Sequence, residues 1–515
     1  MTSPESSRVL VLDFGSQYTQ LIARRIREAH VYCEIQTYNY SLESIRKFNP
    51  AGIILSGGPA SVCATDAPKI DPEIFKLNIP ILGICYGMQL IVQAFGGDVA
   101  PSDKREFGKA DIECDKSDPL FRTLKSPTTV WMSHCDYVTR LPKGFHSVAH
   151  TSNSPVAALT NASHTVYGIQ FHPEVTHTLE GTRLIENFLY QVCNLKPTWT
   201  MASFADQAIE NIRRQVGNER VICALSGGVD SSVVAILIHK AIGDRLTCIF
   251  VNNGLLRKDE VDKIERVFTH TFHIPLISVN AEERFLKKLR GIIDPEAKRK
   301  IIGNEFVSVF DEEARRLKGV EFLAQGTLYP DVIESISFKG PSAVIKSHHN
   351  VGGLPEKMGL KLVEPLRELF KDEVRELGQA LGIPKEVTGR QPFPGPGLAI
   401  RIIGEVTREH IEILRNADEV MMQEVKSSGW YNKVWQTFCI LLPIKTVGVM
   451  GDERTYENVV ALRAVESLDG MTADWAKLPY DLLGRISNRI INEVKGINRV
   501  VFDISSKPPA TIEWE

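Results

Sequence analysis

Short apolar runs alternate with stretches of helical spacing through the first two thirds of the chain. The runs at 79–84 and 221–225 have the length of buried strands, and each leads through a turn into apolar residues at helical spacing. Residues 246–260 predict another strand with its turn. Alternation of strands and helices is typical of α/β proteins with largely parallel sheets. We therefore predict two such α/β domains, at residues 1–196 and 197–390.

The last part, residues 391–515, follows a different order of elements. We predict strands at 400–406, 434–449, 456–466 and 498–504 and helices at 408–425 and 479–493. This order suggests a small α+β domain with its helices on one face of a sheet. The apolar run FCILLPI (438–444) fits a self-association surface and a plain core strand equally well.

Composition narrows the class of protein. The 515 residues are 43% hydrophobic and 24% charged. The net charge of −3 does not indicate the excess of basic residues that is typical of nucleic-acid-binding proteins. No apolar run approaches a membrane span, and the first residues lack the basic start of a signal peptide. Nine cysteines without C-x-x-C spacing argue against disulfides and structural zinc. We expect a cytoplasmic protein that binds neither membranes nor nucleic acid.

The sequence SGGVDSS (226–232) connects the strand at 221–225 to a helix. N–H groups at a helix start lack partners and attract anions, and three serine hydroxyls add donors. The Gly-Lys-Ser/Thr ending of the common phosphate loop is absent, as is G-x-G-x-x-G. Asp230 stands where an anion would bind, which makes sense if Mg²⁺ lies between it and phosphates. The alternative is an ordinary capped helix after a tight turn.

This string resembles the signature of the ATP pyrophosphatase family, which splits ATP between its α- and β-phosphates to adenylate a substrate. The resemblance implies that the end of the next strand holds adenine through backbone groups. It also implies Mg²⁺, held at Asp230 through the phosphates, as the companion of ATP; no zinc, haem or flavin is expected. The implied ATP-binding residues are Ser226, Gly227, Gly228, Val229, Asp230, Ser231, Ser232 and Val251.

In the first third, the sequence GICYG predicts a nucleophile elbow at Cys85. Glycines two residues before and after would relieve crowding at a sharply bent backbone, and the following helix start favours a thiolate. A free cysteine is also a common core residue, which is the alternative for Cys85. A base follows in FHPE, where residues near Pro173 are biased to extended backbone and His172 and Glu174 share a face. The pattern permits a Cys–His–Glu triad, with Cys85 attacking and His172 moving the proton.

SGGP, GICYGMQ and GIQFHPE together resemble class I glutamine amidotransferase domains across the first third. The resemblance implies hydrolysis of glutamine through a γ-glutamyl thioester, with release of ammonia. It places oxyanion donors at the backbone of Gly58 and Tyr86 and a glutamine contact at Gln89. In the matching segment MSHCDYV, Cys135 stands where the family has glycine, so no role is carried over to it.

The remaining motifs lie in the second and third domains. DPEAKRKIIG (294–303) contains a basic triplet, 298–300, which alone would usually be a solvated helix face. Lys346, in a long loop rich in Gly and Pro, could close over ATP phosphates. With QPFPGPGLAIR and the ending KPPATIEWE, these strings are similar to the glutamine-hydrolysing GMP synthase family. Prolines and Trp514 suggest that the last segment docks rather than frays.

The similarity implies a ligase that forms a C–N bond, converting xanthosine monophosphate (XMP) to GMP with glutamine and ATP. It implies XMP contacts at Arg299, Lys507 and Glu513, and a homodimer formed through residues 391–515. Other ATP-pyrophosphatase amidations, such as NAD or asparagine synthetases, pair the loop with different ammonia-producing domains. A tRNA-thiolating enzyme would carry a basic surface, and a non-catalytic glutamine or nucleotide sensor would not need Cys85, His172 and Glu174.

Overall fold

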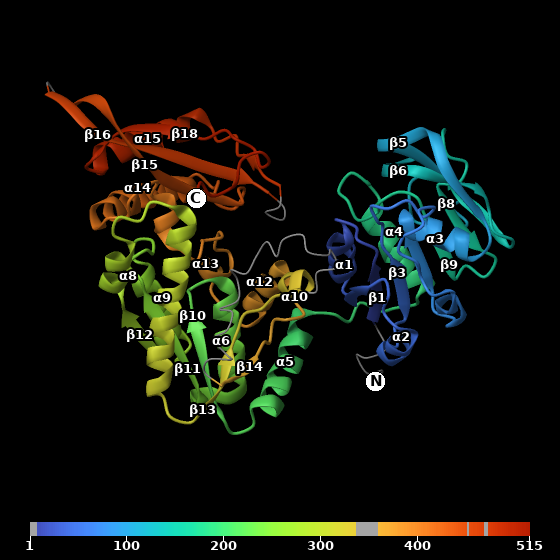
Figure 1. Cartoon of the computed structure of the whole chain (residues 1–515), viewed down its shortest axis with the longest axis horizontal. Coiled ribbons are helices and arrows are strands. Elements are labelled where there is room, and N and C mark those ends of the chain that lie inside the picture. Colours follow the sequence, from blue (N-terminus) through green and yellow to red (C-terminus); the bar gives the residue numbers. More distant parts are fainter. Residues whose placement is uncertain (1–7, 336–358, 451–452, 468–471) are drawn as a thin grey trace. The chain divides into compact units, whose positions relative to one another are not determined.

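The structure is a computed structural model that describes residues 8–335, 359–450, 453–467 and 472–515. These residues fall into two compact units. The first contains the residues up to Phe204 together with residues 332–335, and the second contains the other described residues from Ala205 on. Both appear in Figure 1.

The first unit is built on one nine-stranded sheet in the order β2-β1-β3-β4-β9-β8-β7-β5-β6. Strands β2, β1, β3, β4 and β9 run parallel, and the remaining four continue the sheet with antiparallel pairing. Sequence alternation predicted the parallel half but not the antiparallel extension. The elements are β1 (Arg8–Asp13), α1 (Thr19–Glu28), β2 (Tyr32–Thr37), α2 (Leu42–Phe48), β3 (Gly52–Leu55), η2 (Pro72–Lys76), β4 (Ile81–Ile84), α3 (Tyr86–Ala94), β5 (Asp98–Cys114), β6 (Thr128–Arg140), β7 (Phe145–His150), β8 (Ala158–Asn161), β9 (Val166–Ile169), α4 (Gly181–Asn187) and η3 (Phe188–Val192).

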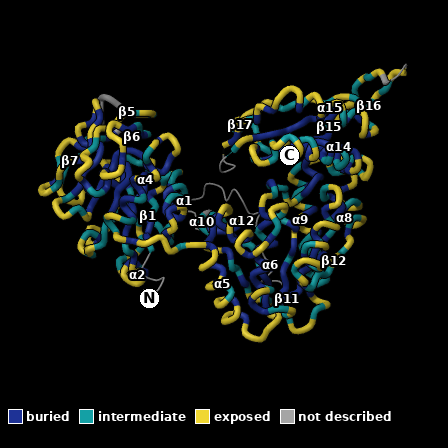
Figure 2. The backbone as a smooth tube through the Cα atoms, turned by 180° about the vertical axis from the view of Figure 1, so that it is seen from behind, coloured by how far each residue is buried: buried dark blue, intermediate teal, exposed yellow. Residues whose placement is uncertain are grey.

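The second unit contains a five-stranded parallel sheet in the order β12-β11-β10-β13-β14. The central strands β10 and β11 are mostly buried, the edge strands β12 and β14 are largely not, and exposed residues lie on the outer faces of the helices (Figure 2). The mostly apolar sequences of β10 and β11 fit burial on both faces of the sheet. The elements are α5 (Met201–Val216, which begins in the first unit), β10 (Arg220–Leu225), α6 (Val229–Ile242), η4 (Gly243–Arg245), β11 (Leu246–Asn252), α7 (Glu260–Glu265), η5 (Arg266–Thr271), β12 (Leu276–Asn280), α8 (Glu282–Leu289), α9 (Pro295–Arg316), β13 (Val320–Ala324), α10 (Tyr329–Ser335, which ends in residues of the first unit), β14 (Lys361–Val363), α12 (Lys371–Ala380) and α13 (Lys385–Thr388).

The last part of the second unit carries a smaller, mostly antiparallel sheet in which β16 pairs with β15, β17 and β18. The α+β class is therefore confirmed. The run 438–444 lies in β15, and its residues Phe438 to Leu441 are buried, as a core strand requires. The elements are η6 (Gly397–Arg401), α14 (Arg408–Ser427), β15 (Gln436–Met450), β16 (Glu453–Glu466), β17 (Asp474–Trp475), α15 (Tyr480–Glu493) and β18 (Ile497–Phe502).

The strand predicted at 400–406 was wrong. The chain forms the short 3-10 helix η6 there, and only Ile402 makes a single bridge to β15, at Leu441. Gly397 has a φ of +65°, and a Cβ at this position would collide with the carbonyl oxygen of Leu255. Leu398 N–H donates to that same oxygen at 2.8 Å. A turn held by another segment therefore overrides the apolar pattern.

One apolar core joins the five-stranded sheet to the last sheet. It contains Ile249 from β11 and Val309 from α9 together with Leu414 from α14 and Leu462 from β16. Burial of such side chains is the main stabilising contribution to folding. The two sheets of the second unit are therefore held together by shared packing, while the division at about residue 390 stays a prediction.

Candidate active sites

Cys85 occupies the sharp bend between β4 and α3. Its backbone has φ 51° and ψ −101°, a left-handed conformation that is strained for a residue with a side chain. A Cβ on Gly83 would lie 2.5 Å from the carbonyl group of Gly87, and a Cβ on Gly87 would lie 2.5 Å from the carbonyl oxygen of Leu55. Both glycines are thus required by close backbone approach, as the elbow pattern predicts.

The structure brings Cys85, His172 and Glu174 together. His172 Nδ1 lies 2.7 Å from Glu174 Oε1, and the His172 ring is hydrogen-bonded to the Cys85 side chain. Burial lowers the pKa of His172, but the charge of Glu174 and the hydrogen bonds with Cys85 and Glu174 outweigh it. They raise that pKa to about 10. The arrangement can keep an imidazolium beside the sulfur and orient it through the carboxylate.

His172 and Glu174 share a side for a different reason from the one predicted. Strand β9 ends at Ile169, so both residues lie in the turn after it rather than on a strand. His172 N–H is held instead by the carbonyl oxygen of Trp131 in β6, at 3.0 Å. The pairing was predicted, but the backbone that produces it was not.

The loop after β3 lies against this group. A Cβ on Gly57 would lie 3.1 Å from His172 Cε1, and one on Gly58 would lie 3.2 Å from the Tyr86 ring. Tyr86 begins α3, so its N–H has no acceptor within the helix. The backbone at Gly58 and Tyr86 is thus beside Cys85, where a developing oxyanion would form.

Three residues complete the surroundings of Cys85. Gln89 is buried and its Nε2 donates to the carbonyl oxygen of Asp136 at 3.1 Å. Gln170 Nε2 lies 3.7 Å from the Cys85 sulfur, and Cys85 Sγ lies 3.7 Å from the carbonyl oxygen of Ser133. Gln170 was missed, although its position two residues before His172 in an extended segment was a usable signal.

In the second unit, residues 226–232 form the turn from β10 into α6. Gly227 has φ +74°, and a Cβ there would collide with the side chain of Ile264. Ser226 Oγ and Ser231 Oγ lie 3.0 Å apart, and Ser232 Oγ donates to the carbonyl oxygen of Gly228 at 2.7 Å. The serines brace the loop while the N–H groups of the first turn, from Val229 on, lack acceptors within α6.

Asp230 has a partner that sequence reasoning missed. Its Oδ2 lies 3.1 Å from Nζ of Lys371, the first residue of α12. The other oxygen, Oδ1, is buried and has no hydrogen-bond partner within the described ranges. An orphaned carboxylate oxygen beside a helix start fits a hard cation such as Mg²⁺ shared with phosphates. Lys346, the predicted lid residue, lies outside the described residues.

Val251 lies near the end of β11, one strand away from the loop. Its side chain is buried, and its register partner is Val279 of β12. Only its backbone is therefore available to contact a ligand at the strand end.

Arg390 is a second contact of the loop at residues 226–232. Its Nη1 donates to the carbonyl oxygen of Gly227 at 3.0 Å, and its Nη2 pairs with Glu260.

The last segment docks, as predicted. Glu513 accepts two hydrogen bonds from Arg401, at 2.8 and 3.0 Å, and a third from Gln436 at 2.8 Å. Trp514 Nε1 donates to Asp503 at 2.9 Å. The main chain of Lys507 pairs with Ala473.

Within the basic triplet, Lys298 contradicts the solvated-face interpretation. It is fully buried, and its Nζ bonds to the carbonyl oxygen of Ile402 at 2.8 Å and to Glu515 Oε2 at 2.5 Å. Arg299 Nη2 donates to the main-chain oxygen of Glu515 at 2.5 Å. A buried lysine needs such acceptors because an unpaired charge is costly away from water. Arg299 and Glu513 thus both lie at the docked segment.

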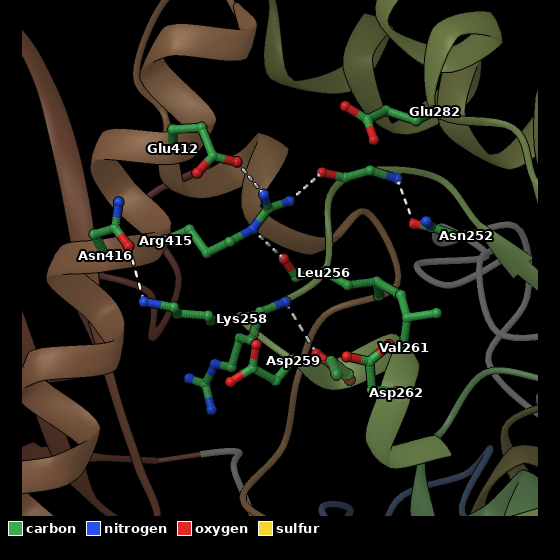
Figure 3. A pocket seen from close by; sticks show the side chains of 13 residues that line it. Asn252, Leu256, Lys258, Asp259, Val261, Asp262, Glu282, Glu412, Arg415 and Asn416 are labelled. Atoms are coloured by element: carbon green, nitrogen blue, oxygen red, sulfur yellow. Dashed lines mark hydrogen bonds and ion pairs between the residues drawn. The ribbon is translucent and has the colours of Figure 1, made fainter. Parts of the chain in front are cut away.

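A separate cavity of about 300 Å³ opens where the loop after β11 faces α14 (Figure 3). Its polar groups largely bind one another: Arg415 bonds to Glu412 and to the carbonyl oxygens of Gly254 and Leu256, and Lys258 bonds to Asn416. It includes Asn252 but none of the residues 226–232. Neither candidate site lies in this cavity.

Comparisons with known proteins decide the family. The model of class I glutamine amidotransferases matches residues 10–192, that of NAD synthase matches 202–289, and that of the GMP synthase C-terminal domain matches 423–514. The curated GMP synthase [glutamine-hydrolyzing] of Brachyspira hyodysenteriae is 60% identical over 508 residues, covering 99% of both chains. That of Carboxydothermus hydrogenoformans is 59% identical over 510 residues, covering 99% of this chain and all of its own. The chain belongs to the glutamine-hydrolysing GMP synthase family.

For a GMP synthase, the two candidate sites divide between the two units, with the triad in the first and the 226–232 loop in the second. No cluster of three or more His, Cys, Asp or Glu suited to a metal occurs in the described part of the chain. None of the helices within the described ranges is long and apolar enough to span a membrane.

Proposed function

We propose that the chain converts XMP to GMP in two coupled reactions. Glutamine and water give glutamate and ammonia; ATP, XMP and ammonia give GMP, AMP and pyrophosphate. The observation that carries this function is full-length identity of about 60% to curated glutamine-hydrolysing GMP synthases. The chain covers at least 99% of the length of both relatives. The sensor alternative is not favoured.

The first reaction takes place at Cys85. Its sulfur attacks the side-chain amide carbon of glutamine, and the backbone N–H groups of Gly58 and Tyr86 stabilise the oxyanion. His172 gives a proton to the departing ammonia and then activates the water that cleaves the γ-glutamyl thioester. Glu174, 2.7 Å from Nδ1, keeps the ring oriented throughout.

The second reaction takes place at residues 226–232. The first-turn N–H groups of α6 bind the β- and γ-phosphates, which leave as pyrophosphate, while the XMP oxygen takes AMP. Val251 contributes backbone contacts to adenine. Mg²⁺ would be held by Asp230 Oδ1 and the phosphates, and when bound it neutralises phosphate charge. Ammonia then replaces AMP on the purine carbon, so exclusion of water protects both the adenylate and the ammonia.

Arg299, Lys507 and Glu513 are assigned to XMP. Support comes from the docked segment, where Arg299 contacts Glu515 and Glu513 is fixed by Arg401 and Gln436. A guanidinium matches a nucleotide phosphate in charge and geometry. Lys346 is assigned to a lid over ATP on the sequence pattern alone.

A homodimer through the last part of the chain is supported by exposed apolar residues. Val447 and Val449 are 49% and 72% exposed on β15, and Tyr456, the register partner of Val447, is 63% exposed on β16. Residues two apart share a face, so the three form one stripe. A Val449→Lys variant is expected to dissociate the dimer in sedimentation experiments. We place the enzyme in the cytoplasm, with its thiols reduced.

The decisive experiment measures AMP and pyrophosphate release by the purified chain with ATP, Mg²⁺ and glutamine. The expected result is release that requires XMP and yields one GMP per AMP. Turnover of ATP with another acceptor, such as an acid, in place of XMP would contradict the proposal.

A further inference from the structure

The first unit contains a second buried histidine–carboxylate pair, close to the triad. His134 in β6 lies opposite Glu106 in β5, and His134 Nε2 is 3.3 Å from Glu106 Oε2. The side chains are 3% and 7% exposed. Glu106 Oε1 accepts a hydrogen bond from Thr151 at 2.9 Å. Neither residue belongs to the catalytic assignment above.

The neighbours of the ring define how the pair is connected. His134 Nδ1 lies 3.0 Å from the carbonyl oxygen of Asp136, which can only accept, so Nδ1 carries a proton. Nε2 then faces the Glu106 carboxylate. A further proton must lie between the two groups, because otherwise a lone pair on Nε2 would face a lone pair on the carboxylate. Burial lowers the pKa of His134 and the positive charge of His172 lowers it further, whereas Glu106 opposes both. The link is therefore a buried hydrogen bond whose loss leaves both groups unsatisfied.

Strand β6 contacts the glutaminase site through its main chain. The carbonyl oxygen of Trp131 accepts from His172 N–H, that of Ser133 lies against Cys85 Sγ, and that of Asp136 accepts from Gln89. Three successive contacts of this kind depend on the position of one strand. The Asp136 oxygen is shared by Gln89 and His134, so the pair is attached directly to the last of these contacts.

A second attachment fixes the same point. The Asp136 carboxylate accepts from Ser61 Oγ at 2.5 Å, which joins β6 to the loop that carries Gly58. The pairing of β5 with β6 shifts register between Pro101 and Glu106, so the backbone pairing of the two strands is interrupted just before Glu106. The hydrogen bond between His134 and Glu106 compensates for that interruption.

We propose that Glu106 and His134 are positioning residues that hold β6 where its main chain meets Cys85, His172 and the glutamine substrate. The inference rests on the proposed glutaminase function of the first unit. Glu106 and His134 act through the main chain of β6 and do not touch the Cys85 sulfur. Their loss therefore affects the alignment of glutamine more than the reactivity of the thiol.

The test compares Glu106→Ala with Glu106→Gln in the full chain. Alanine removes the hydrogen bond with His134, so the KM for glutamine is expected to rise about tenfold or more with kcat changed by no more than about threefold. Glutamine at this position still accepts from Thr151 and can donate to Nε2, so it is expected to restore most of the lost affinity. If Glu106→Ala does not fold, His134→Asn replaces it, because asparagine can still donate to the Asp136 oxygen but does not reach Glu106.

Two readouts separate positioning from other roles. Alkylation of Cys85 by iodoacetamide needs the thiol but no glutamine binding, and it is expected to stay within about twofold of the unsubstituted enzyme. Asp118→Asn removes another buried carboxylate–histidine contact in the same unit, with His164 at 2.9 Å, and is expected to leave the KM unchanged.

Three results would overturn the inference. They are an unchanged KM in Glu106→Ala, an equal defect in Glu106→Gln, and a parallel loss of Cys85 alkylation. Absence of glutaminase activity in the unsubstituted chain would instead refute the proposed function, so the two failures are distinguishable.

Discussion

Glu513 is bound to Arg401 by two hydrogen bonds, at 2.8 and 3.0 Å, and the Arg401 side chain is fully buried. Removing the carboxylate would leave a buried guanidinium without its counter-charge, which costs about 3 kcal/mol. We expect Glu513→Ala to lower the stability of the second unit by this order and to raise the KM for XMP. Denaturant unfolding and XMP titration measure the two effects.

The matched control is Glu493→Ala. Glu493 also binds one arginine, Arg489, through two hydrogen bonds, but both side chains are partly exposed on α15. Exposed pairs contribute little to stability because water and salt screen them. Similar losses in the two variants would show that burial does not set the strength of the Glu513 contact.

Cys85→Ala should abolish GMP formation from glutamine and spare formation from added ammonium. The substitution removes the only nucleophile assigned to the amide, while the ATP loop lies in the other unit. Both rates are measured by GMP release. The control is Cys63→Ser, an exposed cysteine of the same unit, which should keep both activities. Loss of ammonium-dependent synthesis in a folded Cys85→Ala enzyme would contradict the separation of the sites.

Asp230→Asn should remove ATP cleavage and leave glutaminase activity measurable. The amide cannot supply the anionic oxygen that Mg²⁺ requires, so ATP/pyrophosphate exchange in the presence of XMP should fall at least about a hundredfold. Asp244→Asn, an exposed aspartate just after α6, serves as the control and should exchange normally. Unchanged exchange in Asp230→Asn would exclude the metal-holding role of this carboxylate.

The His172–Glu174 pair predicts a pH dependence of stability. The pKa of His172 is raised to about 10 in the folded chain, against about 6.5 for an unperturbed histidine. A raised pKa stabilises fully below the unfolded value, and this contribution is lost as pH rises through about 10. The first unit should therefore lose more thermal stability between about pH 7 and about pH 10.5 than a Glu174→Gln variant does.

Calorimetry measures this difference, because groups that titrate identically in both proteins cancel. The transition of the first unit can be identified by its shift when a glutamine analogue has reacted with Cys85. Equal losses in the two proteins would mean that Glu174 does not raise the pKa of His172.

Local motifs were predictable where nearby residues determine the backbone. The elbow at Cys85 follows from glycines two residues away on each side, and the turn at Gly227 follows from the strand before it and the helix after it. These features depend on steric limits within a few residues. The alternation of strands and helices in the two parallel sheets was predictable for the same reason.

Features set by distant segments were not. The predicted strand at 400–406 is displaced because Leu255 holds Gly397 and Leu398 in a turn. Lys298 lies in a sequence typical of a solvated helix face, yet Glu515 and Ile402 provide it with buried acceptors. No local pattern shows a contact between residues more than a hundred positions apart.

The partners of charged side chains were the hardest to find. Asp230 meets Lys371, 141 residues later, and Glu106 meets His134 across a pair of strands whose register shifts. A sequence gives the charges but not which of them meet. The triad was an exception because His172 and Glu174 are separated by one proline.

The common core of the second unit limits how its parts can be exchanged between enzymes. Side chains of β11, α9, α14 and β16 belong to one apolar core, so replacing the part of the chain after residue 390 by that of another enzyme would require many coordinated substitutions. Heating or denaturant should also melt both sheets in a single cooperative step. Because we assign the docked segment to XMP, we expect changes of acceptor specificity to be easier to reach through its side chains than by recombination near residue 390.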